Sequence, residues 1–212
     1  MAERYTIVGR TSSHFTRAAR IFAFEHGVAH DFELVVDLTS LSTSDYGENP
    51  ALRLPVLKES ERAWFGALNV CRALSRASSE RLRIVWPEQL STPLLSNAQE
   101  LTLQAMASEV ELIMSGNAAA SSTPFSNKRR VSLENSVRWL EQHVDAVLTA
   151  LPAERDLSYL ETTLFCLIEH LDFRQVLSTQ PFERLSAFRA SFAERASARS
   201  TPFMFDASRP AS

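Results

Sequence analysis

Two adjacent serines, Ser12 and Ser13, stand where a β-rich segment gives way to a helix-forming one. Residues 5–8 favour a strand, Gly9 ends it, and from Ala18 onward apolar residues recur at helical spacing. A hydroxyl at the start of a helix can donate a hydrogen bond to an anion such as a thiolate, and the helix dipole favours negative charge there. Serines at such turns also commonly act as simple N-caps, and the residues alone favour that role.

The other reactive side chains form no comparable pattern. His14 could act as a base beside Ser13, but no carboxylate neighbour is evident to orient it, so a plain turn residue is favoured. Cys71 and Cys166 lie far apart without a C-x-x-C pair, and both are expected to be buried in helices. Four further histidines show no ligand spacing and are expected to be structural, namely His26, His30, His143 and His170. No metal site is predicted.

The elements that must position these serines follow the order of a thioredoxin-like domain. We expect a strand at 5–8, a helix that Gly27 ends, a strand at 32–36, a loop with one irregular helix at 37–49, a hairpin of strands at 55–58 and 63–65, and a helix at 68–77. This succession is a β-α-β unit followed by a β-β-α unit.

A polar segment that contains Pro87 separates this region from a second one of different texture. The apolar spacing beyond it predicts helices over 94–114, from a cap at Ser132 to just before Pro152, and over 160–171. The fold class is therefore α/β plus all-α. The predicted parts are a thioredoxin-like domain at 1–77, a linker at 78–92, an all-helical domain at 93–205 and a tail at 206–212.

Composition limits the classes of function. With 45% hydrophobic and 22% charged residues among 212, the chain has the balance of a globular protein that can bury a core. A net charge of -3 and a single short basic run at 128–130, expected to be a solvated turn, argue against nucleic-acid binding. No apolar stretch approaches the roughly 20 residues of a membrane span, and the first residues lack a signal peptide's apolar region. A cytoplasmic protein without membrane contact is expected.

Several motifs in the right order resemble the soluble glutathione transferase superfamily, specifically its bacterial serine-type members. Residues 13–20 resemble the active-site motif S-P-Y-V-R-K-V-R, 49–57 resemble N-P-x-G-K-V-P-V-L, 64–74 resemble W-F-D-S-x-x-I-x-x-Y-L, 157–161 resemble L-S-x-A-D, 171–174 match L-D-F-R, and 192–197 with 201–202 resemble F-x-x-R-P-S and T-x-P. The resemblance covers nearly the whole chain, which makes a chance match implausible.

The resemblance implies a glutathione site in the N-terminal domain. Ser13, with Ser12 beside it, would stabilise the glutathione thiolate and make it a better nucleophile at neutral pH. Pro55 stands at the family's cis-proline position, so that Leu54 would bind the cysteinyl backbone through main-chain atoms. The Arg53 guanidinium could reach the glycyl carboxylate, although a plain surface arginine is an equal alternative.

The match breaks at Gly66 and Ala67. The family reads the γ-glutamyl end of glutathione with an acid and a serine at these positions, and here both side-chain contacts are missing. Hydrogen bonds to charged groups contribute about 1.5–3 kcal/mol each, so the loss of two would weaken binding by roughly two to four powers of ten. The Ala67 backbone N–H can still hold a carboxylate at the helix start. A shift in register by one residue would place Phe65 there and restore nothing.

Two functions from different classes follow from the resemblance. The first is a glutathione transferase, a homodimer that conjugates glutathione to a small hydrophobic electrophile with weakened affinity for glutathione. The second is a non-catalytic binding or interaction protein on the same fold that does not use glutathione. The family builds its electrophile pocket from variable residues of the helical domain, for which Met106, Glu109 and Val110 are candidates from position only. A glutaredoxin-like reductase is disfavoured because the turn at 11–15 has no cysteine.

Overall fold

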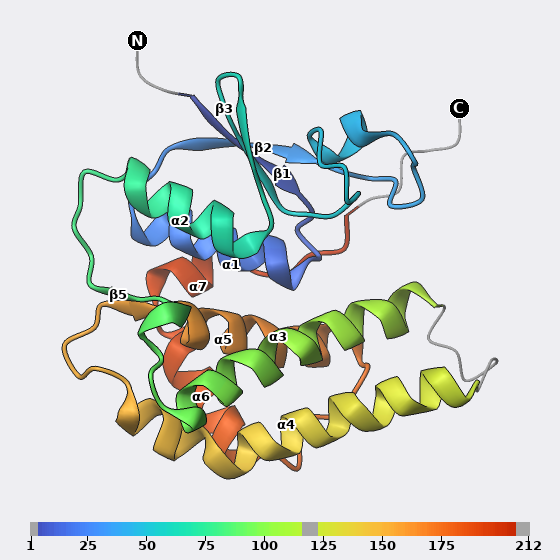
Figure 1. Ribbon diagram of the computed structural model, residues 1–212, viewed down its shortest axis with the longest axis vertical. Helices are drawn as coiled ribbons and strands as arrows, with labels where there is room; N and C mark the ends of the chain where they lie inside the picture. Colours follow the sequence, from blue (N-terminus) through green and yellow to red (C-terminus); the bar gives the residue numbers. More distant parts are fainter. Residues whose placement is uncertain (1–3, 116–122, 207–212) are drawn as a thin grey trace. The chain divides into compact units, whose positions relative to one another are not determined.

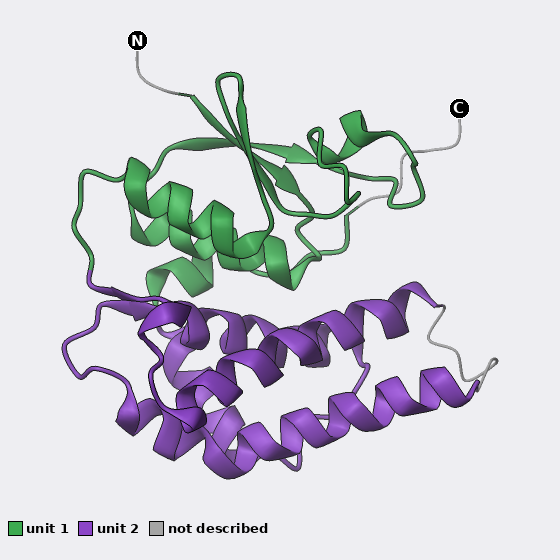
Figure 2. Cartoon of the chain, viewed as in Figure 1, with its two compact units in different colours: residues 1–82, 195–212 green, residues 83–194 purple. Residues whose placement is uncertain are grey.

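The computed structural model describes residues 4–115 and 123–206. The chain divides into two compact units, one that extends up to Leu82 and resumes at Arg195, and one from Arg83 to Glu194 (Figure 2). Each is described by itself.

The described part of the first unit contains a small mixed sheet, three α-helices and one 3-10 helix. Its elements are β1 (Tyr5–Gly9), α1 (His14–Glu25), β2 (His30–Leu34), the 3-10 helix η1 (Thr43–Tyr46), β3 (Val56–Glu59), β4 (Arg62–Phe65), α2 (Ala67–Ala77) and α7 (Ala196–Ser200). The strand order is β2-β1-β3-β4, with β1 parallel to β2 and the other pairs antiparallel. Helices α1 and α2 pack against each other on one face of the sheet (Figure 1). The predicted thioredoxin-like order is confirmed.

The loop after β2 covers part of this unit's core. Val8 and Val56 pack with Val35 and Tyr46 in a buried cluster. The second strand is predicted at 32–36, but β2 spans His30–Leu34, because its register with β1 ends at the pair Gly9 and Leu34. The chain then turns inward, and Val35 contributes to the core instead of continuing the strand.

The second unit is helical. It comprises β5 (Ile84–Val85), the 3-10 helix η2 (Pro87–Gln89), α3 (Pro93–Met114), α4 (Pro124–Ala150), β6 (Leu157–Ser158), α5 (Tyr159–Arg174) and α6 (Glu183–Ala193). Helix α3 packs on α4 and α5, and α6 packs on the same two helices. Five consecutive α5 residues, 164–168, are buried, as expected for a helix that is apolar on every side. Cys71 in α2 and Cys166 in α5 are both buried, as predicted.

Helix α4 begins earlier than the sequence pattern predicts. Thr123, not Ser132, is its N-cap, and the Thr123 side chain accepts a hydrogen bond from the Ser126 N–H. Pro124 at the first helical position fixes a helical φ, which makes this the stronger start signal. The basic run at 128–130 therefore lies in a helix rather than a turn, and Arg129 forms an ion pair with Glu111 of α3. Residues 116–122, between α3 and α4, lie outside the described residues.

The compact units differ from the predicted domain bounds at the C-terminal end. Residues 195–205 are predicted to belong to the helical domain, but α7 packs against α1 of the first unit. Glu25 of α1 accepts hydrogen bonds from Arg195 (2.8 Å) and Ser197 (2.6 Å). The chain returns to the first unit through polar contacts that hydrophobic periodicity does not reveal.

Candidate functional site

The sheet register brings the three segments that are predicted to bind glutathione to the same end of the strands. Val8 near the end of β1 pairs with Val56 at the start of β3, and Val56 pairs with Phe65 at the end of β4. The segments that continue from these three positions are the turn at 10–13, Pro55 before β3, and Gly66 after β4. The Gly66 N–H donates to the Pro55 carbonyl at 3.1 Å, which ties two of the segments together directly.

Ser13 is the N-cap of α1. Its backbone is extended, and its Oγ accepts a hydrogen bond from the Thr16 N–H at 3.3 Å. Ser13 therefore acts as an N-cap, which is the role that the residues alone favoured. Capping uses a lone pair of the oxygen, so the hydroxyl proton can still be donated to an anion. The first turn of α1 contains no acidic residue that would compete for the positive end of the helix dipole.

A close backbone approach fixes the position of this turn. A Cβ on Gly9 would lie 2.4 Å from Cγ2 of Thr16, so only glycine permits the first turn of α1 to pack here. The Thr16 hydroxyl in turn accepts a hydrogen bond from the Arg10 N–H at 3.4 Å. The end of β1 and the start of α1 thus form one packed unit.

His14 is the first residue of α1 and is fully buried. Its Nδ1 accepts a hydrogen bond from the Phe15 N–H at 3.0 Å, and the two rings contact each other edge to face. The ring is therefore part of the packed start of the helix, which agrees with a structural role more closely than with an exposed base.

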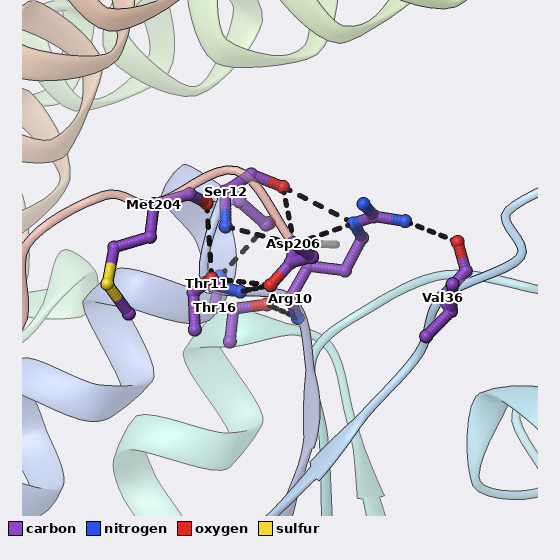
Figure 3. Close-up of polar contacts among 8 residues, drawn as sticks. Arg10, Thr11, Ser12, Thr16, Val36, Met204 and Asp206 are labelled. Carbon is purple, nitrogen blue, oxygen red and sulfur yellow. Dashed lines mark hydrogen bonds and ion pairs between the residues drawn. The ribbon is translucent and has the colours of Figure 1, made fainter. Parts of the chain in front are cut away.

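Ser12 has a partner that the sequence does not suggest, the carboxylate of Asp206 near the end of the chain (Figure 3). The Ser12 hydroxyl donates to this carboxylate at 2.8 Å, and the N–H groups of Thr11 and Ser12 point to it at 3.1 and 3.4 Å. The Thr11 hydroxyl also donates to it, and the Arg10 guanidinium forms an ion pair with it at 3.0 Å. Two backbone donors, two hydroxyls and one cation surround a single carboxylate.

Asp206 remains ionised at neutral pH in this setting. Burial by itself would raise its pKa, but the hydrogen bonds from Thr11 and Ser12 and the charge of Arg10 lower the pKa below its usual value. Only 1% of its side chain is exposed. A composition or spacing pattern could not have found this residue, because the contact joins the two ends of the chain.

The segment before β3 presents main-chain groups at the site. The Leu54–Pro55 peptide bond is cis, as the resemblance implies. Within residues 4–115 and 123–206, neither the N–H nor the C=O of Leu54 forms a hydrogen bond, so both can bind a ligand. The Leu54 side chain packs on the core of the unit, and Arg53 is exposed. Asn49 holds the loop, since its side chain donates to the Arg53 carbonyl at 2.7 Å and accepts from the Ala51 N–H at 3.0 Å.

Gly66 and Ala67 form the start of α2 without a side-chain cap. Gly66 has φ 83° and ψ 149°, a backbone region that is almost restricted to glycine. An ideal Cβ at this position would meet no heavy atom within 4 Å, so backbone conformation alone limits the residue type. Ala67 is the first helical residue, and its N–H lies at the positive end of the helix, where a carboxylate can bind.

The helical unit contains a buried contact between a carboxyl group and an imidazole that no sequence pattern indicated. Glu109 of α3 and His170 of α5 approach to 2.8 Å between Oε1 and Nδ1. Burial raises the pKa of Glu109, while the contact with His170 opposes that rise. Of the other pocket candidates, Met106 is fully buried and Val110 is partly exposed. Met106 and Glu109 are therefore both buried residues of α3.

Comparisons with solved structures identify the fold of the chain. No protein-family model matches the sequence, and no curated protein matches it. A glutathione S-transferase from Methylobacillus flagellatus with glutathione bound is 18% identical with a TM-score of 0.74, and the match covers 94% of this chain and all of that one. One from Methylobacterium radiotolerans in complex with glutathione sulfonate is 14% identical with a TM-score of 0.73, over 99% of this chain and all of that one.

A glutathione transferase family member from Pseudomonas fluorescens with bound glutathione gives a TM-score of 0.74 at 16% identity, over 95% of this chain and all of that one. The chain therefore has the glutathione transferase fold, with a thioredoxin-like N-terminal part and a helical part. This confirms the resemblance of the sequence motifs at the level of fold. None of the described helices has the length and apolar character needed to cross a membrane.

Proposed function

We propose that the protein is a glutathione transferase with weakened glutathione binding. The observation that carries the proposal is Ser13, which caps α1 at the same sheet edge as the open backbone groups of Leu54. Leu54 would hold the cysteinyl backbone of glutathione, and the exposed Arg53 could pair with its glycyl carboxylate. The thiol sulfur would then lie near Ser13 and the start of α1.

The chemistry assigned to Ser13 is thiolate stabilisation. The thiol loses its proton to solvent, and the Ser13 hydroxyl donates a hydrogen bond to the resulting thiolate. The sulfur electron pair forms a bond to an electrophilic carbon, and the leaving group departs with the electron pair of the broken bond. Ser13 suits this role better than Ser12, because the Ser12 hydroxyl already donates to Asp206.

The γ-glutamyl end has fewer partners. Ala67 offers its backbone N–H to a carboxylate, but neither Gly66 nor Ala67 offers a side chain. The loss of two charge-assisted hydrogen bonds would weaken binding by roughly two to four powers of ten relative to a site that retains both side chains. A homodimeric, cytoplasmic protein is part of the same proposal, and its elution volume on a sizing column tests the oligomeric state.

Two variants of Ser13 and one control variant test the catalytic assignment. Glycine is nearly as good an N-cap as serine, so Ser13→Gly removes the hydroxyl with little effect on the helix, while Ser13→Thr retains a hydroxyl. The thiol pKa of bound glutathione, followed by the ultraviolet absorbance of the thiolate, should rise by about one to two units in Ser13→Gly and stay low in Ser13→Thr. Ser132→Ala, an exposed serine in α4, is the matched control. Equal pKa values in wild type and Ser13→Gly would remove Ser13 from the mechanism.

A second candidate function is supported by the bare start of α2. A binding or interaction protein on this fold would need neither the acid nor the serine that Gly66 and Ala67 replace. Calorimetric titration with glutathione separates the two functions. Heat that is reduced in Arg53→Met but not in Arg81→Met, which changes an exposed arginine elsewhere, supports the enzyme. The absence of heat up to the solubility limit of glutathione supports the second function.

A further inference from the structure

The last described residues form a strap, defined here as residues 202–206, that is anchored on α1. Arg17 of α1 places its guanidinium 4.4 Å from the centre of the Phe203 ring. The same guanidinium donates to the Ala198 carbonyl at 3.4 Å, in the helix that leads into the strap. These contacts fix the direction in which the chain leaves α7. The start of the strap is therefore held against α1 before the chain reaches the turn at 10–12.

Beyond Phe203 the strap makes polar contacts with the turn at 10–12. Met204 and Phe205 are 52% and 69% exposed, so their side chains contribute little burial. The Met204 carbonyl accepts a hydrogen bond from the Thr11 hydroxyl at 3.1 Å, and the next anchor is the carboxylate of Asp206 (Figure 3). The Asp206 carboxylate thus makes most of the polar contacts between the strap and the turn at 10–12. An anion that takes the place of this carboxylate removes these contacts and weakens the attachment of the strap.

The donors that hold Asp206 define a site for an anion. They comprise the N–H and hydroxyl groups of both Thr11 and Ser12 and the guanidinium of Arg10. Hydrogen bonds to an ionised acceptor are about twice as strong as neutral ones. This turn is also the one that leads to Ser13, where the proposed function places the glutathione thiolate. A second negative charge beside Asp206 is disfavoured, because the donors are already used and like charges repel.

We infer that Asp206 is an internal competitor for the anionic ligand of this turn, and that the strap must leave before glutathione binds with full affinity. The inference rests on the proposed function, because it assumes that the thiolate of glutathione occupies this turn. Release of the strap removes the Asp206 carboxylate from the Ser12 hydroxyl, which can then donate to sulfur beside the Ser13 hydroxyl. Only molecules with an open strap bind glutathione with full affinity. The apparent affinity therefore equals the affinity of the open form multiplied by the fraction of molecules that are open.

The expected effect follows from that fraction. A strap closed in about nine molecules of ten weakens glutathione binding about tenfold. Asp206→Ala should therefore bind glutathione about tenfold more tightly than wild type, or better. Phe205→Ala, which changes the exposed neighbour and leaves the carboxylate in place, should bind as wild type does.

Two measurements on the full-length chain test the inference. Calorimetric titration of wild type, Asp206→Ala and Phe205→Ala with glutathione gives the affinities, and S-methylglutathione, which has no thiolate, is titrated in parallel. Amide hydrogen exchange of Thr11 and Ser12 without ligand reports whether the strap protects the turn. Support requires tighter binding of glutathione by Asp206→Ala alone, a smaller gain for S-methylglutathione, and faster exchange at Thr11 and Ser12 in that variant.

The possible failures are distinguishable. Equal glutathione affinities in all three proteins would overturn the competition and leave the proposed function intact. Equal gains for glutathione and S-methylglutathione would show that the strap does not compete with the thiolate, which also overturns the inference. If no protein binds glutathione, including Asp206→Ala, the proposed function fails and the inference fails with it.

Discussion

Two substitutions at the start of α2, Ala67→Ser and Gly66→Asp, give back the serine and the acid that the resemblance leads one to expect. One tests the binding of glutathione, and the other tests the strain in the backbone. Ala67 is the first residue of α2, and 7% of its surface is exposed. Because both residues adopt helical backbone angles, Ala67→Ser adds one hydroxyl without a change of backbone. In the proposed complex, this hydroxyl donates to the γ-glutamyl carboxylate. A hydrogen bond to a charged group is worth about 1.5–3 kcal/mol, so affinity for glutathione should rise about tenfold to a hundredfold.

Gly66→Asp should behave differently. Its φ of 83° with ψ of 149° costs a residue with a Cβ about 1–3 kcal/mol, while the space around the new Cβ is open. The free energy of unfolding should fall by about that amount, although the new carboxylate could pair with the glutathione ammonium. Ala67→Ser should therefore change mainly the affinity for glutathione, and Gly66→Asp should change mainly the free energy of unfolding.

Calorimetric titration with glutathione and urea unfolding of wild type, both single variants and the double variant measure the two effects. Ala77→Ser, at the other end of the same helix, controls for a serine added to α2. If Ala67→Ser binds glutathione no better than Ala77→Ser does, the assignment of this helix start to the γ-glutamyl end is refuted. An unchanged urea midpoint for Gly66→Asp would show that the backbone conformation of Gly66 carries no strain for other residues.

Three further changes test the structure around the site. Gly9→Ala places a Cβ 2.4 Å from Cγ2 of Thr16 and should lower the free energy of unfolding by about 1–3 kcal/mol, with partial recovery in Gly9→Ala combined with Thr16→Ala, both measured by urea unfolding. Asn49→Ala leaves two backbone groups without their partner and should cost about 1–3 kcal/mol by the same measurement, together with weaker glutathione binding because the loop that carries Leu54 loosens. Burial lowers the pKa of His26, whose ring nitrogens form no hydrogen bond to any part of the chain that the structure describes. As the pH falls, the histidine of the unfolded chain therefore takes up a proton before that of the folded chain does. The free energy of unfolding should decrease as the pH drops below 6.5, the ordinary pKa of histidine. His26→Phe should reduce this slope, and an equal slope in both proteins would contradict the assignment.

Much of the first unit follows from local sequence. The β-hairpin of β3 and β4, the helix that starts after Ser13 and the helix that starts after Gly66 are specified by patterns within a few residues. Capping is a local interaction, so the role of Ser13 as an N-cap could be anticipated from its position. The absence of an acid and a serine at Gly66 and Ala67 is a property of the sequence itself.

The start of α4 and the bounds of β2 were harder to anticipate, for two different reasons. Thr123 with Pro124 outweighs Ser132 because a proline at the first helical position fixes φ, a signal that apolar spacing does not weigh. The position of β2 depends on its pairing with β1, and Val35 leaves the strand to join a core cluster. Pairing and core contacts between segments are decided by tertiary structure.

The sequence by itself determined the order of elements, the serine at the start of α1 and the missing side chains at the start of α2, because each depends on neighbours along the chain. Only the tertiary structure decided what surrounds the preceding serine, Ser12. Asp206 meets Ser12 across 194 positions of sequence, and Glu109 meets His170 across two helices, so no local pattern records either contact. The physical reason is that these side chains meet only when folding packs distant segments of the chain against each other.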